Sequence, residues 1–130
     1  MFATTALEKY VAWYKLIWSL QDQTKGSASK LEFPYKNFRS GQRDMAAAVF
    51  RSARDGESLL CEAPTGTGKT LSSLFPVVKA LGEGYAKHAV YLTAKTSGRQ
   101  SVMQSVRLLE EAGLKTVSYT HLTLPTTPYV

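Results

Sequence analysis

The sequence predicts an α/β fold, in which a parallel sheet is flanked by helices and preceded by an N-terminal helix. Mostly apolar runs at residues 58–62, 89–93 and 114–117 alternate with helical patterns at 68–81 and 98–112. Strands that alternate with helices in this way usually lie parallel and are joined by right-handed crossovers. Hydrophobic residues make up 44% of the 130 residues, which is enough for one small packed domain and argues against a disordered chain.

The first element is a helix expected at about residues 5–21. Thr5 and Glu8 have the spacing of a capping box at its start. Apolar side chains recur on one face of this helix, a pattern that favours core packing over ligand stacking; they are Leu7, Tyr10, Val11, Tyr14, Ile17 and Trp18. Residues 21–32 are polar and contain Gly26, so we expect a connector there.

A second helix is expected to begin at Ser40, whose hydroxyl can cap it, and to run to about Arg54. The run at 58–62 predicts a short buried strand, within which Cys61 is interpreted as a small core residue. A third helix should run from Gly68 to Leu81, with a kink at Pro76.

The second strand is expected at residues 89–93. His88, just before it, has no second ligand in view and is expected to be an exposed loop residue. The last helix, at 98–112, presents an inner face made of Val102, Val106 and Leu109. A third strand should begin at Leu114.

The strongest chemical signal is a phosphate-binding loop of the Walker A type between the first strand and the third helix. It comprises Ala63, Pro64, Thr65, Gly66, Thr67, Gly68, Lys69 and Thr70. Gly66 and Gly68 permit backbone angles that turn N–H groups toward a phosphate, and the helix that follows adds its positive end. Lys69 is predicted to contact the β- and γ-phosphates of ATP, and the Thr70 hydroxyl to ligate Mg²⁺.

A second, upstream signal consists of Phe33, Tyr35, Arg39 and Gln42. The amide of Gln42 can donate and accept at once, which matches the edge of adenine, and an aromatic ring can cover a purine face. The alternative is that the aromatic residues are ordinary core residues and Gln42 a solvated helix position. The phosphate loop about twenty residues later favours the nucleotide-binding interpretation.

Three strings carry a resemblance to a known family: FPYKNFRSGQ, then EAPTGTGKT, then YLTAKTSGRQ. The chain resembles the start of a superfamily 2 DNA helicase of the DinG/XPD type, whose Q motif, motif I and motif Ia these strings match. Ala in place of the first Gly of the phosphate loop is the form seen in helicases. The likeness covers about residues 33–116.

This resemblance implies a partial RecA-like P-loop NTPase domain that binds ATP and Mg²⁺. Tyr35 or Phe33 would stack on adenine and Gln42 would read its edge. Thr93, Lys95 and Thr96 would contact the backbone of single-stranded DNA or of a forked duplex, without reading bases. For these three residues an ordinary strand-to-helix turn is the alternative.

The same resemblance implies parts that this chain lacks. Such helicases use an acidic box for Mg²⁺, arginines from a second RecA-like domain and, in some members, four cysteines that hold an iron–sulfur cluster. Cys61 is the sole cysteine here, so the cluster's ligands are absent. The interpretation is an N-terminal helix and linker (1–32), a truncated first helicase domain (33–116), and a tail (117–130). The fragment alone is expected to be inactive.

The tail is set apart because every charged residue lies between Glu8 and Lys115. Residues 117–126 resemble the translation of a transposon-end sequencing adapter, so we expect this segment to be foreign and the natural protein to be longer. The alternative is that this segment is a polar tail or an edge strand of the protein.

Charge and cysteine usage agree with a nucleotide-binding protein. Sixteen Lys and Arg against ten Asp and Glu leave a net charge of +6, which favours an anionic partner, although a solvated basic surface is an equal alternative. A single cysteine excludes a disulfide framework and suits the cytoplasm. No signal peptide or membrane span is expected. Two other functions stay open: another P-loop ATPase or kinase, and a short non-catalytic module that binds nucleotide or DNA.

Overall fold

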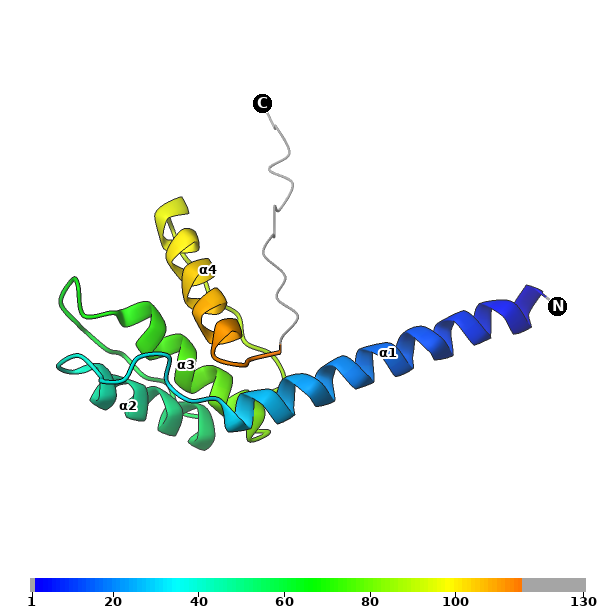
Figure 1. The fold of residues 1–130 in the computed structure, drawn as a ribbon, viewed down its shortest axis with the longest axis horizontal. Helices are drawn as coiled ribbons and strands as arrows, with labels where there is room; N and C mark the ends of the chain where they lie inside the picture. Colours follow the sequence, from blue (N-terminus) through cyan, green and yellow to red (C-terminus); the bar gives the residue numbers. More distant parts are fainter. Residues whose placement is uncertain (1, 116–130) are drawn as a thin grey trace, which may run out of the picture.

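The structure, a computed structural model, describes residues 2–115 and contains four helices in that range (Figure 1). These are α1 (Phe2–Lys30), α2 (Gln42–Asp55), α3 (Lys69–Gly82) and α4 (Thr96–Glu111). Helix α3 is central, because α1, α2 and α4 all pack against it. Most of α1 projects away from this bundle, while its last turns join it.

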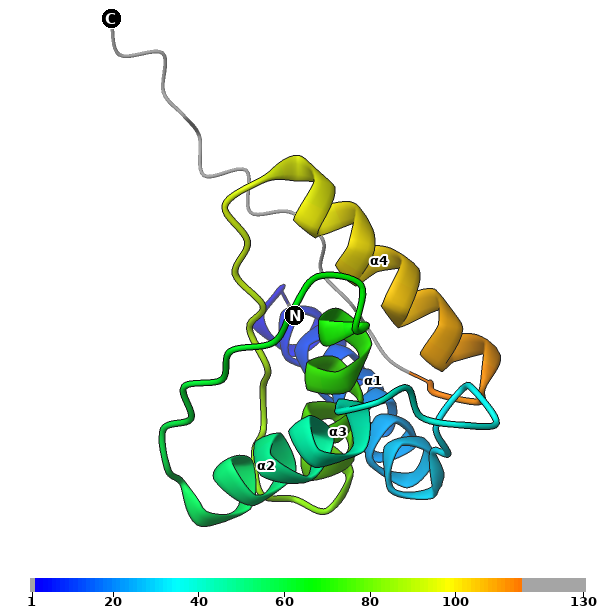
Figure 2. The same cartoon turned by 90° about the vertical axis from the view of Figure 1, so that its left-hand side faces the viewer.

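The prediction of an α/β fold with a parallel sheet is wrong for the part of the chain that the structure describes. Residues 58–62 and 89–93 are extended coil rather than strands, one leading from α2 to α3 and the other from α3 to α4 (Figure 2). A strand exists only when a neighbouring strand pairs with its backbone groups. Between residues 2 and 115 no backbone hydrogen bond joins the two segments to each other or to a third one. The fold of the described residues is therefore all-helical.

Side-chain exposure shows the same lack of partners. Leu60 is fully exposed, and Leu92 and Val90 are 85% and 77% exposed. Cys61, predicted to be a core residue, is exposed as well. Within residues 2–115, the apolar runs that predicted buried strands have no apolar surface against which to pack. The exposure predicted for His88 is confirmed.

Helix α1 differs from its prediction at both ends. It begins at Phe2, so the spacing of Thr5 and Glu8 does not mark its start. It continues through the residues expected to form a connector, as far as Lys30. Within this segment hydroxyl groups donate to carbonyls three or four residues earlier, such as Thr24 to Leu20 and Ser27 to Thr24.

Tertiary packing explains why a polar segment with a glycine stays helical to Lys30. Ala28 is completely buried where α1 meets α3. At the end of α3, a Cβ atom on Gly82 would overlap the backbone of Ala28 and Ser29, so glycine permits the two helices to approach this closely. Lys79 then donates a hydrogen bond of 2.8 Å to the Ser29 carbonyl.

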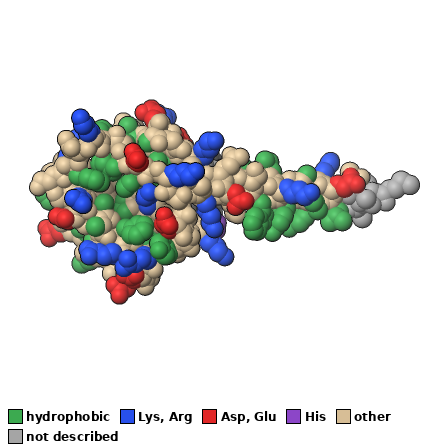
Figure 3. Space-filling view, turned by 60° about the horizontal axis from the view of Figure 1, so that its bottom comes forward, with side chains coloured by type: hydrophobic (Ala, Val, Ile, Leu, Met, Phe, Trp, Pro, Cys, Tyr) green, Lys and Arg blue, Asp and Glu red, His purple; other side chains and the backbone are tan. Residues whose placement is uncertain are grey.

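The first part of α1 carries an apolar face that the structure leaves uncovered, visible along one side of the projecting helix in Figure 3. The prediction that these residues pack in a core is wrong within residues 2–115. Rings along this face contact one another: Tyr10 and Tyr14 stack at 6.3 Å between centroids, and the centroids of Tyr14 and Trp18 also lie 6.3 Å apart. Exposed members of this face are Leu7, Tyr10, Val11, Trp13, Tyr14, Leu16 and Trp18.

The other three helices lie close to their predicted positions. Helix α2 begins one residue after Gly41, which is in the left-handed conformation, and no side chain caps it, so the predicted cap at Ser40 is wrong. Helix α3 is continuous through Pro76, which is buried. Helix α4 begins two residues earlier than predicted, and its Leu109 is completely buried, as the predicted inner face requires.

The core lies around α3, which packs against the end of α1 and against α4. Partly buried Phe33, Phe75 and Val106 pack on it. Its buried residues are Ala28, Leu31, Leu71, Leu74, Val78, Leu109 and Leu114. This core fixes α3, and with it the loop that precedes α3. The predicted tail at 117–130 lies outside the described residues.

Candidate nucleotide-binding site

The loop at residues 63–70 makes a tight turn that ends in the first residues of α3. Gly66 and Gly68 adopt φ values of 79° and 73°, in the region that side chains disfavour. Thr67 closes the turn by donating a 2.8 Å hydrogen bond to the Pro64 carbonyl. Gly66 and Gly68, which the sequence predicted to need unusual backbone angles, therefore both adopt the left-handed conformation.

Lys69 folds back across this loop. Its ammonium group donates a 2.8 Å hydrogen bond to the carbonyl of Ala63, the first residue of the loop. An ammonium has three donors, so two remain for another acceptor in the same place. No carboxylate pairs with Lys69 among the described residues, where Arg54 and Asp55 form the one ion pair, at the far end of α2. The loop thus keeps an uncompensated positive charge.

Thr70 is the second residue of α3, where backbone N–H groups lack intrahelical partners. Its hydroxyl oxygen lies 3.1 Å from the hydroxyl oxygen of Ser101 on α4. Two residues further along α3, the Ser72 hydroxyl donates a 2.9 Å hydrogen bond to the Gly68 carbonyl, one turn earlier. The start of α3 is therefore anchored by hydroxyl contacts on two sides.

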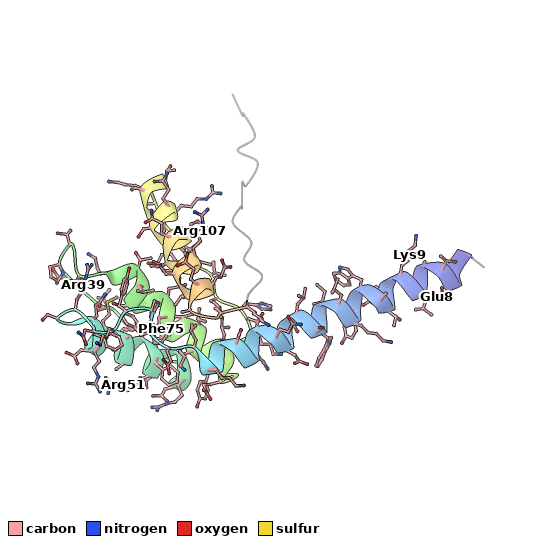
Figure 4. The ribbon with its side chains drawn as sticks, in the orientation of Figure 1. Glu8, Lys9, Arg39, Arg51, Phe75 and Arg107 are labelled. Atoms are coloured by element: carbon pink, nitrogen blue, oxygen red, sulfur yellow. The ribbon has the colours of Figure 1, made fainter. Side chains whose placement is uncertain are left out.

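Gln42 and Arg39, the polar residues of the upstream signal, contact the phosphate loop directly. Gln42 is buried, accepts a 2.8 Å hydrogen bond from the Arg39 backbone N–H, and donates a longer one, 3.5 Å, to the Gly68 carbonyl. The guanidinium of Arg39 donates 3.2 Å to the Gly66 carbonyl. Figure 4 shows Arg39 at the end of the bundle opposite the free end of α1. The alternative of a solvated position for Gln42 is wrong.

The two aromatic candidates for adenine stacking differ in exposure. Phe33 is packed between Phe38, stacked at 4.1 Å, and Phe75, in edge contact at 5.3 Å. Tyr35 lies 6.2 Å from Phe33 between ring centroids and is 51% exposed. Phe33 is thus a half-buried neighbour of the core, and Tyr35 is the candidate with the more accessible ring.

Thr93, Lys95 and Thr96 lie at the start of α4 and are exposed. Lys95 is the N-cap position of that helix and Thr96 is its first residue. The Thr93 hydroxyl donates 3.4 Å to the Lys95 carbonyl, and the Thr93 side chain lies against Gly98. Among residues 2–115 no hydrogen bond joins these three residues to the phosphate loop.

The geometry of the loop fits a polyphosphate. A Cβ atom at Gly66 would meet no atom within 4 Å, so the space beside this glycine is open. Helix α3 contributes unpaired N–H donors and its positive end, and Lys69 contributes an ammonium group. The Thr70 hydroxyl supplies an oxygen donor, which is the ligand type that Mg²⁺ prefers.

Two shallow surface hollows lie elsewhere. One is lined by α1 residues that include Leu7, Val11 and Lys15, and the other by α4 residues that include Gln104 and Arg107. Each is lined by a single helix, so neither has the converging groups of a ligand site. Within the described residues no group of three or more His, Cys, Asp or Glu could hold a metal ion. No helix in that range has the length and apolar character of a membrane span.

Comparison with known proteins identifies the family of this chain. The family model for DEAD/DEAH box helicases matches residues 43–125, a range that includes the phosphate loop, α3 and α4. This chain belongs to the DEAD/DEAH box helicase family. The expectation of a helicase family is thereby confirmed. The matched range also takes in residues 117–125, for which a foreign origin was expected.

Individual relatives are longer helicases. The ATP-dependent DNA helicase DinG of Salmonella choleraesuis is 39% identical over 100 residues, which cover 75% of this chain and 12% of that protein. The ATP-dependent helicase DinG of Mycobacterium tuberculosis is 50% identical over 44 residues, or 33% of this chain and 7% of the relative. A probable ATP-dependent helicase of Methanocaldococcus jannaschii is 32% identical over 82 residues, which cover 63% of this chain and 11% of that protein. No solved structure matches significantly.

Sequence reasoning missed the hydroxyl partners of the loop. Ser101 and Ser72 are ordinary helix residues with no motif spacing, and their role depends on how α3 packs against α4 and against the loop. Thr67 lies inside the motif, but the direction of its hydroxyl toward Pro64 has no sequence signal.

Proposed function

We propose that this chain is the ATP-binding part of an ATP-dependent DNA helicase of the DinG type. In the complete protein it binds ATP with Mg²⁺ and couples hydrolysis to movement along single-stranded DNA. The observation that carries the proposal is the loop at 63–70, with Gly66 and Gly68 in left-handed conformations and the Lys69 ammonium bonded to the Ala63 carbonyl. Membership of a helicase family supports the DNA-directed part.

Each loop residue has a distinct role in this proposal. The backbone N–H groups around Gly66 and Gly68 bind phosphate oxygens. The Lys69 ammonium donates to the β- and γ-phosphates, either in place of the Ala63 carbonyl or in addition to it. Thr70 offers its hydroxyl to Mg²⁺. The bound ion neutralises phosphate charge and polarises the bond to be broken.

Recognition of the base is assigned to the upstream segment, as a Q motif. Tyr35 is the better placed of the two rings for stacking on adenine, because Phe33 already packs against Phe38 and Phe75. Gln42 reads the adenine edge with its amide. To do so it has to release the long hydrogen bond to Gly68, which is the weaker of its two contacts.

Contacts with DNA are assigned to Thr93, Lys95 and Thr96. Their exposure at the start of α4 and the lysine charge suit the backbone of a single strand, which offers phosphates without a required base sequence. They lie at or just before the start of α4, the helix that carries Ser101, whose hydroxyl contacts the hydroxyl of Thr70. The proposed DNA contacts and the contact with the nucleotide-binding loop thus both lie in one short segment, residues 93–101.

The test is hydrolysis by the full-length protein with and without single-stranded DNA. We expect ATPase activity that needs Mg²⁺, rises on addition of single-stranded DNA, and is competed by ADP. A kinase or a transporter-type ATPase would hydrolyse or transfer phosphate without a response to DNA. A non-catalytic module would bind without turnover. Absence of DNA stimulation in a folded, ATP-binding protein would overturn the helicase proposal.

A further inference from the structure

Ser101 is a serine of α4 that no motif assigns, and it lies against the start of α3. Its hydroxyl oxygen is 3.1 Å from the hydroxyl oxygen of Thr70, although the two residues are 31 positions apart in sequence. Both residues are half-buried. The contact joins the two helices at the residue that offers oxygen to Mg²⁺.

A threonine hydroxyl has one hydrogen and two lone pairs. When it ligates a cation through a lone pair, its hydrogen has to point away from the ion, and an acceptor on that side fixes the direction. Without such an acceptor the hydroxyl rotates freely, and the entropy lost when the ion stops that rotation weakens binding of the ion. The 3.1 Å between the Thr70 and Ser101 hydroxyl oxygens is slightly longer than a typical O–H···O hydrogen bond, and either hydroxyl can be the donor. When the Thr70 lone pairs face a cation, the Thr70 hydroxyl has to be the donor and Ser101 Oγ the acceptor.

Neighbouring hydroxyl groups do not take this place. Ser73 donates 3.0 Å to the backbone carbonyl of Thr70, not to its hydroxyl. Ser105 donates 3.0 Å to the backbone carbonyl of Ser101 within α4. The side-chain oxygen of Ser101 is thus the contact recorded for the Thr70 hydroxyl among the described residues.

We propose that Ser101 is a positioning residue for Mg²⁺: its oxygen accepts the hydrogen of the Thr70 hydroxyl and thereby directs a Thr70 lone pair at the ion. The inference rests on the proposed function, because it requires Thr70 to be the magnesium ligand. It goes beyond that function by extending the metal site to a second helix.

The experiment measures binding of ATP to the full-length protein by calorimetry across a range of Mg²⁺ concentrations, and in EDTA. Ser101→Ala is compared with Ser101→Thr, which keeps a hydroxyl, and with Ser105→Ala, the matched serine one turn along α4. We expect Ser101→Ala to raise the Mg²⁺ concentration for half-maximal binding by roughly 3- to 10-fold, the effect of one hydrogen bond. Affinity in EDTA should not change, and the other two variants should resemble the wild type.

A double-mutant cycle with Thr70→Ala guards against a general loss of structure. Once Thr70 lacks its hydroxyl, removal of the Ser101 hydroxyl should no longer change the Mg²⁺ dependence, whereas a folding defect would add to it. An unchanged Mg²⁺ dependence in Ser101→Ala, or additive effects in the cycle, overturns the proposal for Ser101. Wild-type Mg²⁺ dependence in Thr70→Ala itself would instead refute the proposed magnesium site.

Discussion

The amide of Gln42 lies so close to Gly68 that a Cβ atom on that glycine would overlap the Gln42 side chain. The glycine also has a φ of 73°, which disfavours any other residue at this point of the loop, and an added Cβ atom would in addition displace the Gln42 amide. The upstream segment and the phosphate loop therefore form one packed unit, and a change in either should affect the other.

Gly68→Ala tests this packing. We expect a loss of stability from the left-handed backbone of about 1–2 kcal/mol, and a further loss from overlap with Gln42. ATP affinity should fall by at least about tenfold, since the loop cannot keep its shape. Gly84→Ala is the control, because Gly84 has a φ of 83° but open space around it and lies outside the loop. Equal ATP affinity in both variants would contradict the account.

Gln42→Ala separates base recognition from packing. It removes the acceptor for the Arg39 N–H and should lower the free energy of unfolding by about 1–3 kcal/mol. The preference for ATP over GTP should also weaken. Thermal unfolding and nucleotide competition measure the two effects, with Gln100→Ala, an exposed position on α4, as the control. A variant that is destabilised but keeps full ATP selectivity would show that Gln42 serves packing alone.

The junction of α1 and α3 predicts opposite effects for two glycines. Gly82→Ala places a Cβ atom against the backbone of Ala28 and Ser29 and should destabilise the protein by about 1–3 kcal/mol. Gly26→Ala, within α1 and in open space, should stabilise it by about 0.5–1 kcal/mol through helix propensity. Chemical denaturation measures both, and a stable Gly82→Ala variant would mean that the helices do not approach this closely.

Much of the site could be predicted from sequence because its signals are local. A glycine pattern followed by a helix start specifies the loop, and the structure has the left-handed glycines and the start of α3 at Lys69. The sequence singles out both Gln42 and Gly68 as candidate site residues, but it does not predict that their side chain and backbone are in contact. Ser101 could not, since its position depends on helix packing alone.

The sheet failed as a prediction for a physical reason. Apolar runs such as residues 58–62 indicate a preference for an extended backbone, but strands also need pairing partners, and the described residues bring none to Leu60 or Leu92. The prediction for the polar end of α1 was also wrong, but here the structure is more regular than expected. The composition predicts a connector, whereas burial of Ala28 against α3 keeps the segment helical.

Lys95→Ala tests the proposed DNA contacts. Loss of one phosphate contact should weaken binding of single-stranded DNA uniformly across sequences and reduce the slope of affinity against salt by about one unit. ATP binding without DNA should stay at its wild-type value. Lys87→Ala, an exposed lysine outside the proposed surface, serves as the control. The same salt dependence in both variants would remove Lys95 from the DNA surface.

The most direct measurement is calorimetry of ATP binding to the full-length protein, with and without Mg²⁺, for the wild type and Lys69→Ala. We expect magnesium-dependent binding of ATP to the wild type and loss of that binding in Lys69→Ala, with the folded state and most of the DNA affinity retained. A folded wild-type protein that takes up no ATP in the presence of Mg²⁺, or a Lys69→Ala variant that binds it equally well, would contradict the assignment of the loop at 63–70.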